Sequence, residues 1–218
     1  MSHNDSVTMH HPRSNVQSMT SQELSTAPNT MRNVSFAVVD FETTGLNPET
    51  DRIVQLAAVI VNGEGHIVDS FDTIVKPESP AEYQHGAEHI HGITVEQVSS
   101  GMPLRKALEQ LWSINAGHVF TAHNAAFDLG FLHAESKRVG LEGHVDVHVD
   151  TLELSRRTTG ADTTRRHNLF ALCEHYGIER DQVHDARSDA TATAQLLMHL
   201  IKELGVETPD QVAELFAP

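Results

Sequence analysis

Runs of β-branched and aromatic residues, bounded by glycine, proline and asparagine, predict five β-strands in this chain. The runs occupy residues 34–39, 53–61, 66–75, 118–122 and 145–150. A glycine-containing turn at 62–65 joins the second run to the third, which is typical of an antiparallel hairpin. We therefore expect the first three strands to form an antiparallel meander.

Between and after the strands, apolar residues recur at the three- and four-residue spacing of amphipathic helices. The predicted helices occupy residues 94–99, 103–114, 124–134, 151–158, 168–176 and 185–204. Thr94, Asn124 and Asp185 stand where an N-cap is expected. The last helix carries alanines on its buried stripe near its start, so this end can approach the sheet closely. These elements together predict one α/β domain over residues 34–204.

The two ends of the chain differ in composition from this domain. Residues 1–33 are rich in polar side chains with almost no large aliphatic ones, so we expect a disordered tail. Residues 205–218 predict a short helical appendage that begins near Pro209. No apolar run approaches the ~20 residues that span a membrane, and the start of the chain lacks the apolar core of a signal peptide. A single cysteine, Cys173, fits a reducing cytoplasm.

The chain carries 15 basic and 30 acidic residues, which gives a net charge of −15. A broad basic face that clamps duplex nucleic acid is therefore not expected. A local basic loop or bound metal ions could still contact nucleic acid. Four arginines flank the polar stretch 158–164: Arg156, Arg157, Arg165 and Arg166. They are either a solvated surface or a phosphate-contacting patch, and the sequence favours neither.

Two carboxylates, Asp40 and Glu42, follow the first predicted strand. Side chains two residues apart in a strand point to the same side, and like charges there repel each other unless a cation lies between them. Carboxylate oxygens suit Mg²⁺ or Mn²⁺. Acids solvated beside a turn are the alternative interpretation. Residues 43–45 open that turn, and we expect their backbone N–H groups to be free for a ligand.

Further candidate residues lie at the starts of two predicted helices. Asp128 falls in the first turn of the helix that begins near Asn124, where the helix dipole alone can explain an acid. Asp189 lies at the edge of the buried face of the last helix, and His184 lies just before that helix. A histidine-rich stretch is interpreted as helix-face and turn residues rather than as a zinc site, because no fourth ligand follows it: His85, His89 and His91.

Three stretches resemble, in order, the three motifs of the DEDDh 3′–5′ exonucleases. They are Asp40-Phe-Glu42-Thr-Thr-Gly45, His123-Asn-Ala-Ala-Phe-Asp128, and His184 followed five residues later by Asp189. Within this family, the chain is similar to the proofreading epsilon subunit of bacterial DNA polymerase III and its stand-alone relatives. Supporting similarities lie at residues 91–94, 150–152 and 168–178. The resemblance covers roughly residues 34–204, and four acids and a histidine in one order make it specific.

The resemblance implies a ribonuclease-H-like α/β fold, with a five-stranded mixed sheet flanked by helices and two strands parallel to the first. It implies that His184 is the general base. Four acids are expected to serve catalysis by holding two Mg²⁺ or Mn²⁺ ions: Asp40, Glu42, Asp128 and Asp189. Substrate contacts are expected from Thr43, Thr44, Leu46, His123 and Asn124. The two threonines would hold the terminal 3′-hydroxyl, and Leu46 would wedge against the last base.

The function that these expectations favour is metal-dependent 3′–5′ hydrolysis of DNA, with release of nucleoside 5′-monophosphates in proofreading or repair. The expected substrates are single-stranded DNA and frayed 3′ ends, and DNA polymerase III is a candidate partner. Trimming of RNA 3′ ends is the alternative, because both activities use the same acids. A non-catalytic scaffold subunit of a replication complex is a third interpretation, against which the retention of all five catalytic-type residues argues.

Overall fold

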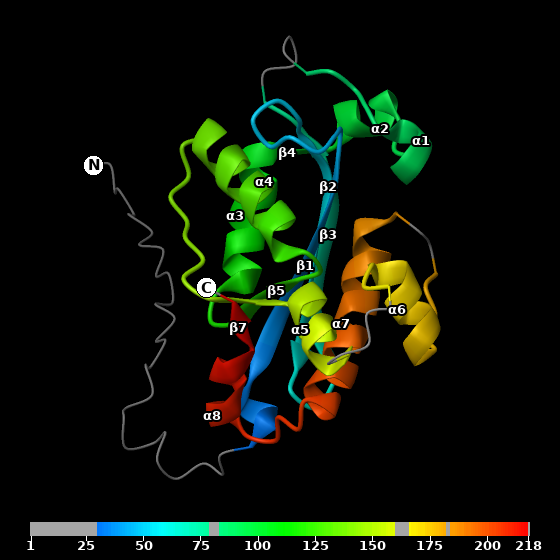
Figure 1. Cartoon of the computed structure of the whole chain (residues 1–218). Helices are drawn as coiled ribbons and strands as arrows, with labels where there is room; N and C mark the ends of the chain where they lie inside the picture. The colour runs from blue at the N-terminus through cyan, green and yellow to red at the C-terminus, as the bar shows by residue number, and fades with distance from the viewer. Residues whose placement is uncertain (1–29, 79–82, 160–165, 182–183, 218) are drawn as a thin grey trace, which may run out of the picture.

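The computed structural model describes residues 30–78, 83–159, 166–181 and 184–217, and a central β-sheet organises them (Figure 1). Its strands are β1 Ser35–Thr43, β2 Ile53–Asn62, β3 Ile67–Lys76, β4 Met102–Pro103, β5 Val119–Ala122, β6 His148–Asp150 and β7 Phe216–Ala217. Their order across the sheet is β4-β3-β2-β1-β5-β6-β7. The predicted tail lies outside the described residues except at 30–33, where Met31–Asn33 form a 3-10 turn, η1.

The pairing of the strands confirms the expected mixed sheet. β1 pairs with β2, and β2 with β3, in the antiparallel sense, which gives the predicted meander. β5 runs parallel to β1, and β6 runs parallel to β5. The carboxyl ends of β1, β5 and β6 therefore lie at the same end of the sheet, and the helices that follow β5 and β6 begin there.

The predicted number of five strands is wrong, because the described part of the sheet has seven. β4 pairs with β3 only at Val75 and Lys76, and β7 pairs with β6 at His148 and Val149. Each extra strand has two residues, which is too short to show a period-two pattern in the sequence. The strand predicted from residue 145 also begins later, at His148.

Helices cover both faces of this sheet, as Figure 1 shows. Their bounds are α1 Glu88–His91, α2 Val95–Ser100, α3 Leu104–Asn115, α4 Ala125–Arg138, α5 Thr151–Thr159, α6 Leu169–Tyr176, α7 Ala186–Glu203 and α8 Pro209–Val212. The 3-10 turn η2, Ala213–Leu215, follows α8. Helices α3 and α4 lie on one face, and α5, α6 and α7 lie on the other. No helix in the described part of the chain is both long enough and apolar enough to span a membrane.

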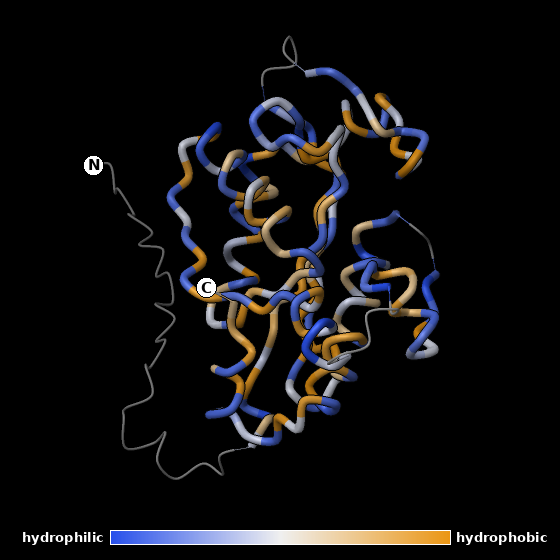
Figure 2. The backbone as a smooth tube through the Cα atoms, viewed as in Figure 1, coloured by the Kyte–Doolittle hydropathy of each residue, from blue (hydrophilic) through white to orange (hydrophobic). Residues whose placement is uncertain are grey.

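Alternating side chains of β1 supply the two layers of the core. Phe36 and Val38 pack with the helices on the α7 face, whereas Val39 and Phe41 pack with α3 and α4 on the other face. Apolar residues accordingly concentrate in the central strands (Figure 2). The same alternation directs Asp40 toward the α7 face. The predicted alanine stripe of α7 is buried against this face, at Ala186, Ala190 and Ala194.

The end of the described chain joins the same core. Val212 of α8 and Leu215 of η2 are buried among residues of the α7 face. Phe216 then pairs with Val149 of β6. The predicted helix near Pro209 is therefore present, but it is followed by a strand that the sequence pattern did not reveal.

Candidate active site

The end of β1 presents two acids at an irregular point in the sheet. Asp40 lies opposite Ala57 of β2, and Glu42 lies opposite Gln55, after which the register shifts between Glu42 and Thr43. A bulge next to a functional residue bends the strand and changes the direction of the side chains around it. Asp40 and Glu42 are two residues apart before the bulge, so they point to the same side, as the sequence predicted, and this side is the face covered by α7.

The start of α7 is fixed above these acids by its own cap and by β2. The Asp185 carboxylate accepts a hydrogen bond from the Ser188 backbone N–H at 3.0 Å, which confirms the predicted N-cap. The Gln55 side chain donates to Asp185 Oδ2 at 2.9 Å and accepts from the Ala186 N–H at 3.1 Å. Gln55 therefore ties the first turn of α7, which carries Asp189, to the strand beside Glu42. No local sequence pattern pointed to Gln55, since its partners lie about 130 residues away in sequence.

Asp128 comes to the same end of the sheet from α4, the helix on the face opposite α7. It lies in the first turn of α4 and is 4% exposed. The backbone of Phe41, the residue between the two acids of β1, acts on its carboxyl group and lowers its pKa against the larger effect of burial. The first turn of α4 therefore brings Asp128 to the strand that carries Asp40 and Glu42.

One buried carboxylate, Asp150, holds the start of α4 in place. Its Oδ1 accepts hydrogen bonds from the N–H groups of Asn124 and Leu152, both at 2.9 Å, and its Oδ2 accepts from Ala125 at 3.1 Å. The side chain of Asn124 makes no cap hydrogen bond, and its φ of 70° lies in the left-handed region. The prediction that Asn124 caps this helix with its own side chain is therefore wrong, because an acid from β6 takes that role for the first turns of both α4 and α5.

Replacing Asp150 by Ala is expected to lower the free energy of unfolding by about 2–4 kcal/mol, since one cap is worth about 0.5–2 kcal/mol and this carboxylate serves two helices. Urea unfolding followed by circular dichroism would measure the change. The exposed Asp146→Ala variant is the matched control, with an expected change within about 0.5 kcal/mol. Equal stability of the two variants would show that Asp150 does not hold these helices.

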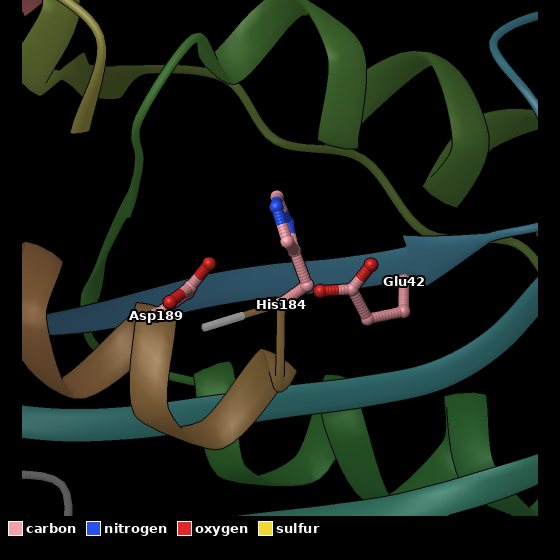
Figure 3. A group of neighbouring side chains, drawn as sticks. All are labelled: Glu42, His184 and Asp189. Atoms are coloured by element: carbon pink, nitrogen blue, oxygen red, sulfur yellow. The ribbon is translucent and has the colours of Figure 1, made fainter. Parts of the chain in front are cut away.

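Glu42, His184 and Asp189 are neighbours in the structure (Figure 3). One potential ligand atom from each of them lies within 4.8 Å of the other two, so the three residues could hold a metal ion. They come from the end of β1, from the residue before the N-cap of α7, and from the first turn of α7. His184 is exposed and has a φ of 59°. A non-glycine residue in the left-handed region is uncommon, and such conformations cluster at functional sites.

The four acids are electrostatically coupled. Burial, followed by the charges of Asp128, Asp189 and Glu42, raises the pKa of Asp40 well above its usual value. Burial and the neighbouring charge of Asp189 raise the pKa of Glu42 to about 7. Burial likewise raises the pKa of Asp128 and of Asp189. The folded chain thus holds its acids where full ionisation is unfavourable unless a cation is present.

A cation from the chain itself lies at this cluster. The Nε and Nη2 groups of Arg180 both donate to Asp189 Oδ1, the former at 3.1 Å. The side chain of Arg180 is 8% exposed. Sequence reasoning missed this arginine, because it stands outside the three motifs and in no basic run.

Residues 37–197 match the sequence model of the RNase_T family, which is described as an exonuclease. The chain belongs to the DEDDh family of 3′–5′ exonucleases. The resemblance found in the sequence, and the ribonuclease-H-like fold that it implied, are therefore confirmed.

Two relatives in sequence are DNA polymerase III enzymes of the PolC type. The one from Oceanobacillus iheyensis is 37% identical over 170 residues, and the one from Bacillus cereus is 33% identical over 181 residues. The matched regions cover 78% and 82% of this exonuclease. They cover only 12% of each relative, so the similarity concerns one part of those long proteins.

Solved structures share the fold at lower identity. The nuclease domain of 3′hExo, a DEDDh family member bound to rAMP, has a TM-score of 0.67 and 18% identity, covering 78% of this exonuclease and 92% of that chain. Escherichia coli exonuclease I in complex with a dT13 oligonucleotide has a TM-score of 0.67 and 20% identity, covering 79% and 42%. The sheet and helices of this chain are therefore arranged as in those two structures.

The turn after β1 in this exonuclease differs in part from expectation. The backbone N–H of Thr44 donates to the Arg52 carbonyl at 2.9 Å, so the prediction of a free N–H is wrong at this residue. The loop is tight enough that a Cβ at Gly45 would lie 2.5 Å from the Asp51 carboxylate. Leu46 projects from the same loop with 85% exposure. An apolar side chain so exposed is available to contact a ligand, as the wedge prediction requires.

His123, the residue before Asn124, is partly buried and contacts the start of α5. Its Nδ1 lies 2.9 Å from the Thr151 hydroxyl oxygen. Burial lowers the pKa of His123 to about 4. A neutral, partly buried imidazole packed against α5 fits a role in positioning the start of α4.

The lowered pKa of His123 predicts acid sensitivity. The unfolded chain binds a proton at this residue below pH 6.5, whereas the folded chain binds it only near pH 4. Stability from this residue is therefore present above pH 6.5 and is lost as the pH falls from 6.5 to about 4, by about 2–3 kcal/mol after allowance for partial exposure. His123→Gln should remove this part of the pH dependence in urea titrations at pH 7 and pH 4.5, whereas the exposed His144→Gln should keep it. Parallel profiles for all three proteins would contradict the assignment.

Other residues singled out in the sequence have partners within the protein. His91 Nε2 lies 3.2 Å from the Gly86 carbonyl oxygen, and its Nδ1 accepts from Ile93. His85 contacts Tyr83 and Glu88, which agrees with the interpretation of this stretch as structural rather than zinc-binding.

The arginines near the start of the polar loop also bind protein groups. Arg156 pairs with Glu153, and Arg157 donates to the Glu214 carbonyl at 2.7 Å. Arg165 lies outside the described residues, and Arg166 is exposed. The contact of Arg157 ties α5 to η2, so one member of the proposed basic patch serves packing.

Proposed function

We propose that this exonuclease removes nucleotides from the 3′ end of single-stranded or frayed DNA, releasing nucleoside 5′-monophosphates in proofreading or repair. The observation that carries the choice of DNA is the identity above 30% to DNA polymerase III enzymes of the PolC type. Neighbours whose names or ligands refer to RNA share 18% identity, which supports the fold alone. DNA polymerase III is the proposed partner on the same ground.

The proposed cofactor is a pair of Mg²⁺ or Mn²⁺ ions, and the residues present fit it. All four acids offer hard oxygen ligands at one end of the sheet, and their pKa values are raised, which indicates a site short of positive charge. Asp40, Glu42, Asp128 and Asp189 would hold the ions. When bound, a metal pair supplies an activated water and neutralises charge on the attacking and leaving oxygens.

The chain's own residues perform the remaining steps. His184, exposed beside Glu42 and Asp189, accepts the proton of the attacking water, as an imidazole can near neutral pH. Leu46 packs against the terminal base. Thr43 lies at the end of β1 beside the acids and orients the 3′-hydroxyl. Asp150 and Gln55 position the two helices that carry the second pair of acids.

The test is a time course on 5′-labelled single strands of identical sequence, one of DNA, one of RNA and one of DNA ending in a single ribonucleotide, with Mg²⁺ or Mn²⁺ present. Asp40→Asn is the inactive reference, and Asp146→Asn, far more exposed, is the matched control. A ladder that shortens from the 3′ end of DNA supports the proposal. Faster shortening of RNA would transfer the same chemistry to RNA trimming. If none of the three oligonucleotides is shortened, the interpretation as a non-catalytic scaffold would be favoured.

A further inference from the structure

Arg180 is a buried cation that the proposed reaction does not use. It follows α6, in the connection that leads to α7, and its guanidinium turns inward to Asp189. Two of its N–H groups donate to the same oxygen, Oδ1, rather than one to each carboxylate oxygen. Its 8% exposure separates it from a surface arginine such as Arg187, which is 58% exposed and pairs with Asp72.

The charge of Arg180 acts on most of the acid cluster. It lowers the pKa values of Asp40, Glu42 and Asp189, against the burial that raises all three. An arginine side chain stays protonated under all ordinary conditions. Arg180 therefore supplies permanent positive charge to a site that four carboxylates would otherwise make strongly negative.

This arrangement conflicts with the binding of a divalent ion at the same carboxylate. Mg²⁺ binds carboxylate oxygens at about 2.0–2.1 Å and demands near-ideal octahedral geometry. A divalent ion bound to the Asp189 carboxylate would lie close to the guanidinium that is hydrogen-bonded to the same carboxylate, and the two cations would repel each other. The guanidinium cannot relieve this repulsion by losing a proton. The repulsion is relieved most when the guanidinium leaves the carboxylate.

We propose that Arg180 is an internal counter-ion that competes with the divalent ion for Asp189 and thereby sets the metal affinity of the site. The inference rests on the metal site of the proposed function. In the absence of metal, Arg180 neutralises part of the cluster and holds Asp189. On metal binding, the guanidinium is displaced from Asp189. The enzyme thus binds its cofactor more weakly than its four acids alone would allow.

The experiment measures Mn²⁺ binding by isothermal titration calorimetry at pH 8 for the wild type, Arg180→Met, Arg180→Lys and the control Arg187→Met. Methionine keeps the apolar stem without the charge. Arg180→Met is expected to bind Mn²⁺ at least tenfold more tightly than the wild type, which is about 1.4 kcal/mol. Arg180→Lys should fall between them, because an ammonium is better hydrated and cannot form the paired contact. Arg187→Met should match the wild type.

Thermal unfolding with and without Mn²⁺ gives a second readout. Without metal, Arg180→Met should unfold at a lower temperature than the wild type. Saturating Mn²⁺ should raise the unfolding temperature of Arg180→Met by more than it raises that of the wild type. If this variant does not fold without metal, Arg180→Lys carries the comparison.

The outcomes separate this inference from the proposed metal site. Equal or weaker Mn²⁺ binding by both Arg180 variants, beside normal binding by the wild type, would overturn the competition and leave the metal site in place. No binding by any of the proteins would overturn both. Binding by Arg180→Met alone would support the competition in its strongest form.

Discussion

Exonuclease turnover by Asp189→Asn is expected to fall by about 10³-fold or more, with the fold retained, because removal of a proposed metal ligand disables the charge neutralisation on which phosphodiester hydrolysis depends. The substitution keeps the size of the side chain at a site that is 7% exposed. His184→Ala should lower turnover by about 10²–10⁴-fold through the loss of the proposed general base. Single-turnover rates on 5′-labelled DNA would measure both losses.

A matched substitution separates chemistry from folding in this test. Asp146→Asn makes the same change in a side chain that is 89% exposed, and it should keep the wild-type rate. Circular dichroism and urea unfolding would establish that all variants are folded. Wild-type turnover by Asp189→Asn or by His184→Ala would show that the site has been assigned to the wrong residues.

Chelation is expected to abolish turnover, and addition of Mg²⁺ or Mn²⁺ is expected to stabilise the fold more at pH 8 than at pH 6. Without metal, a carboxyl group whose folded pKa is raised destabilises the folded chain as it ionises. For Glu42, stability therefore falls as the pH rises from about 4.5 to about 7. Metal opposes this loss, and fewer protons compete with it at pH 8. At a free metal concentration 100 times the Kd, the expected gain is about 2.7 kcal/mol.

Thermal unfolding at both pH values, with chelator and with metal, measures this effect. Asp189→Asn provides the control, since it should lose most of the metal-dependent gain at pH 8 while remaining folded. A gain that is the same at pH 6 and pH 8, or that survives in Asp189→Asn, would count against these acids as the ligands.

Local sequence patterns predicted those parts of the fold that neighbouring residues determine. The period-two alternation of β1 placed Asp40 and Glu42 on one side, and the caps at Thr94 and Asp185 were identified correctly because a cap bonds within its own first turn. The cap of α4 was predicted wrongly, because it comes from Asp150, about 25 residues further along the chain.

The residues that support the site were hidden for the same reason. Gln55 is a polar residue in an apolar strand, which signals a buried partner but not which one. Arg180 pairs with an acid nine residues away across the start of a helix, and no motif includes it. The two-residue strands β4 and β7 depend wholly on partners that tertiary packing supplies. Such contacts follow from the folded arrangement rather than from any local pattern.

The pairing of β7 with β6 leaves a strand of only two residues at this border of the sheet, and a border strand so short offers another chain little to pair with. β6 lies near one border of the sheet, and Phe216 and Ala217 cover the backbone groups that it would otherwise present to solvent. An uncovered strand border is a template on which another chain can add. Shortening the chain before residue 205 would therefore do more than remove buried side chains. It would expose the unpaired backbone N–H and C=O groups of β6, the strand that ends in Asp150. The shortened protein should therefore aggregate before it loses its active-site geometry.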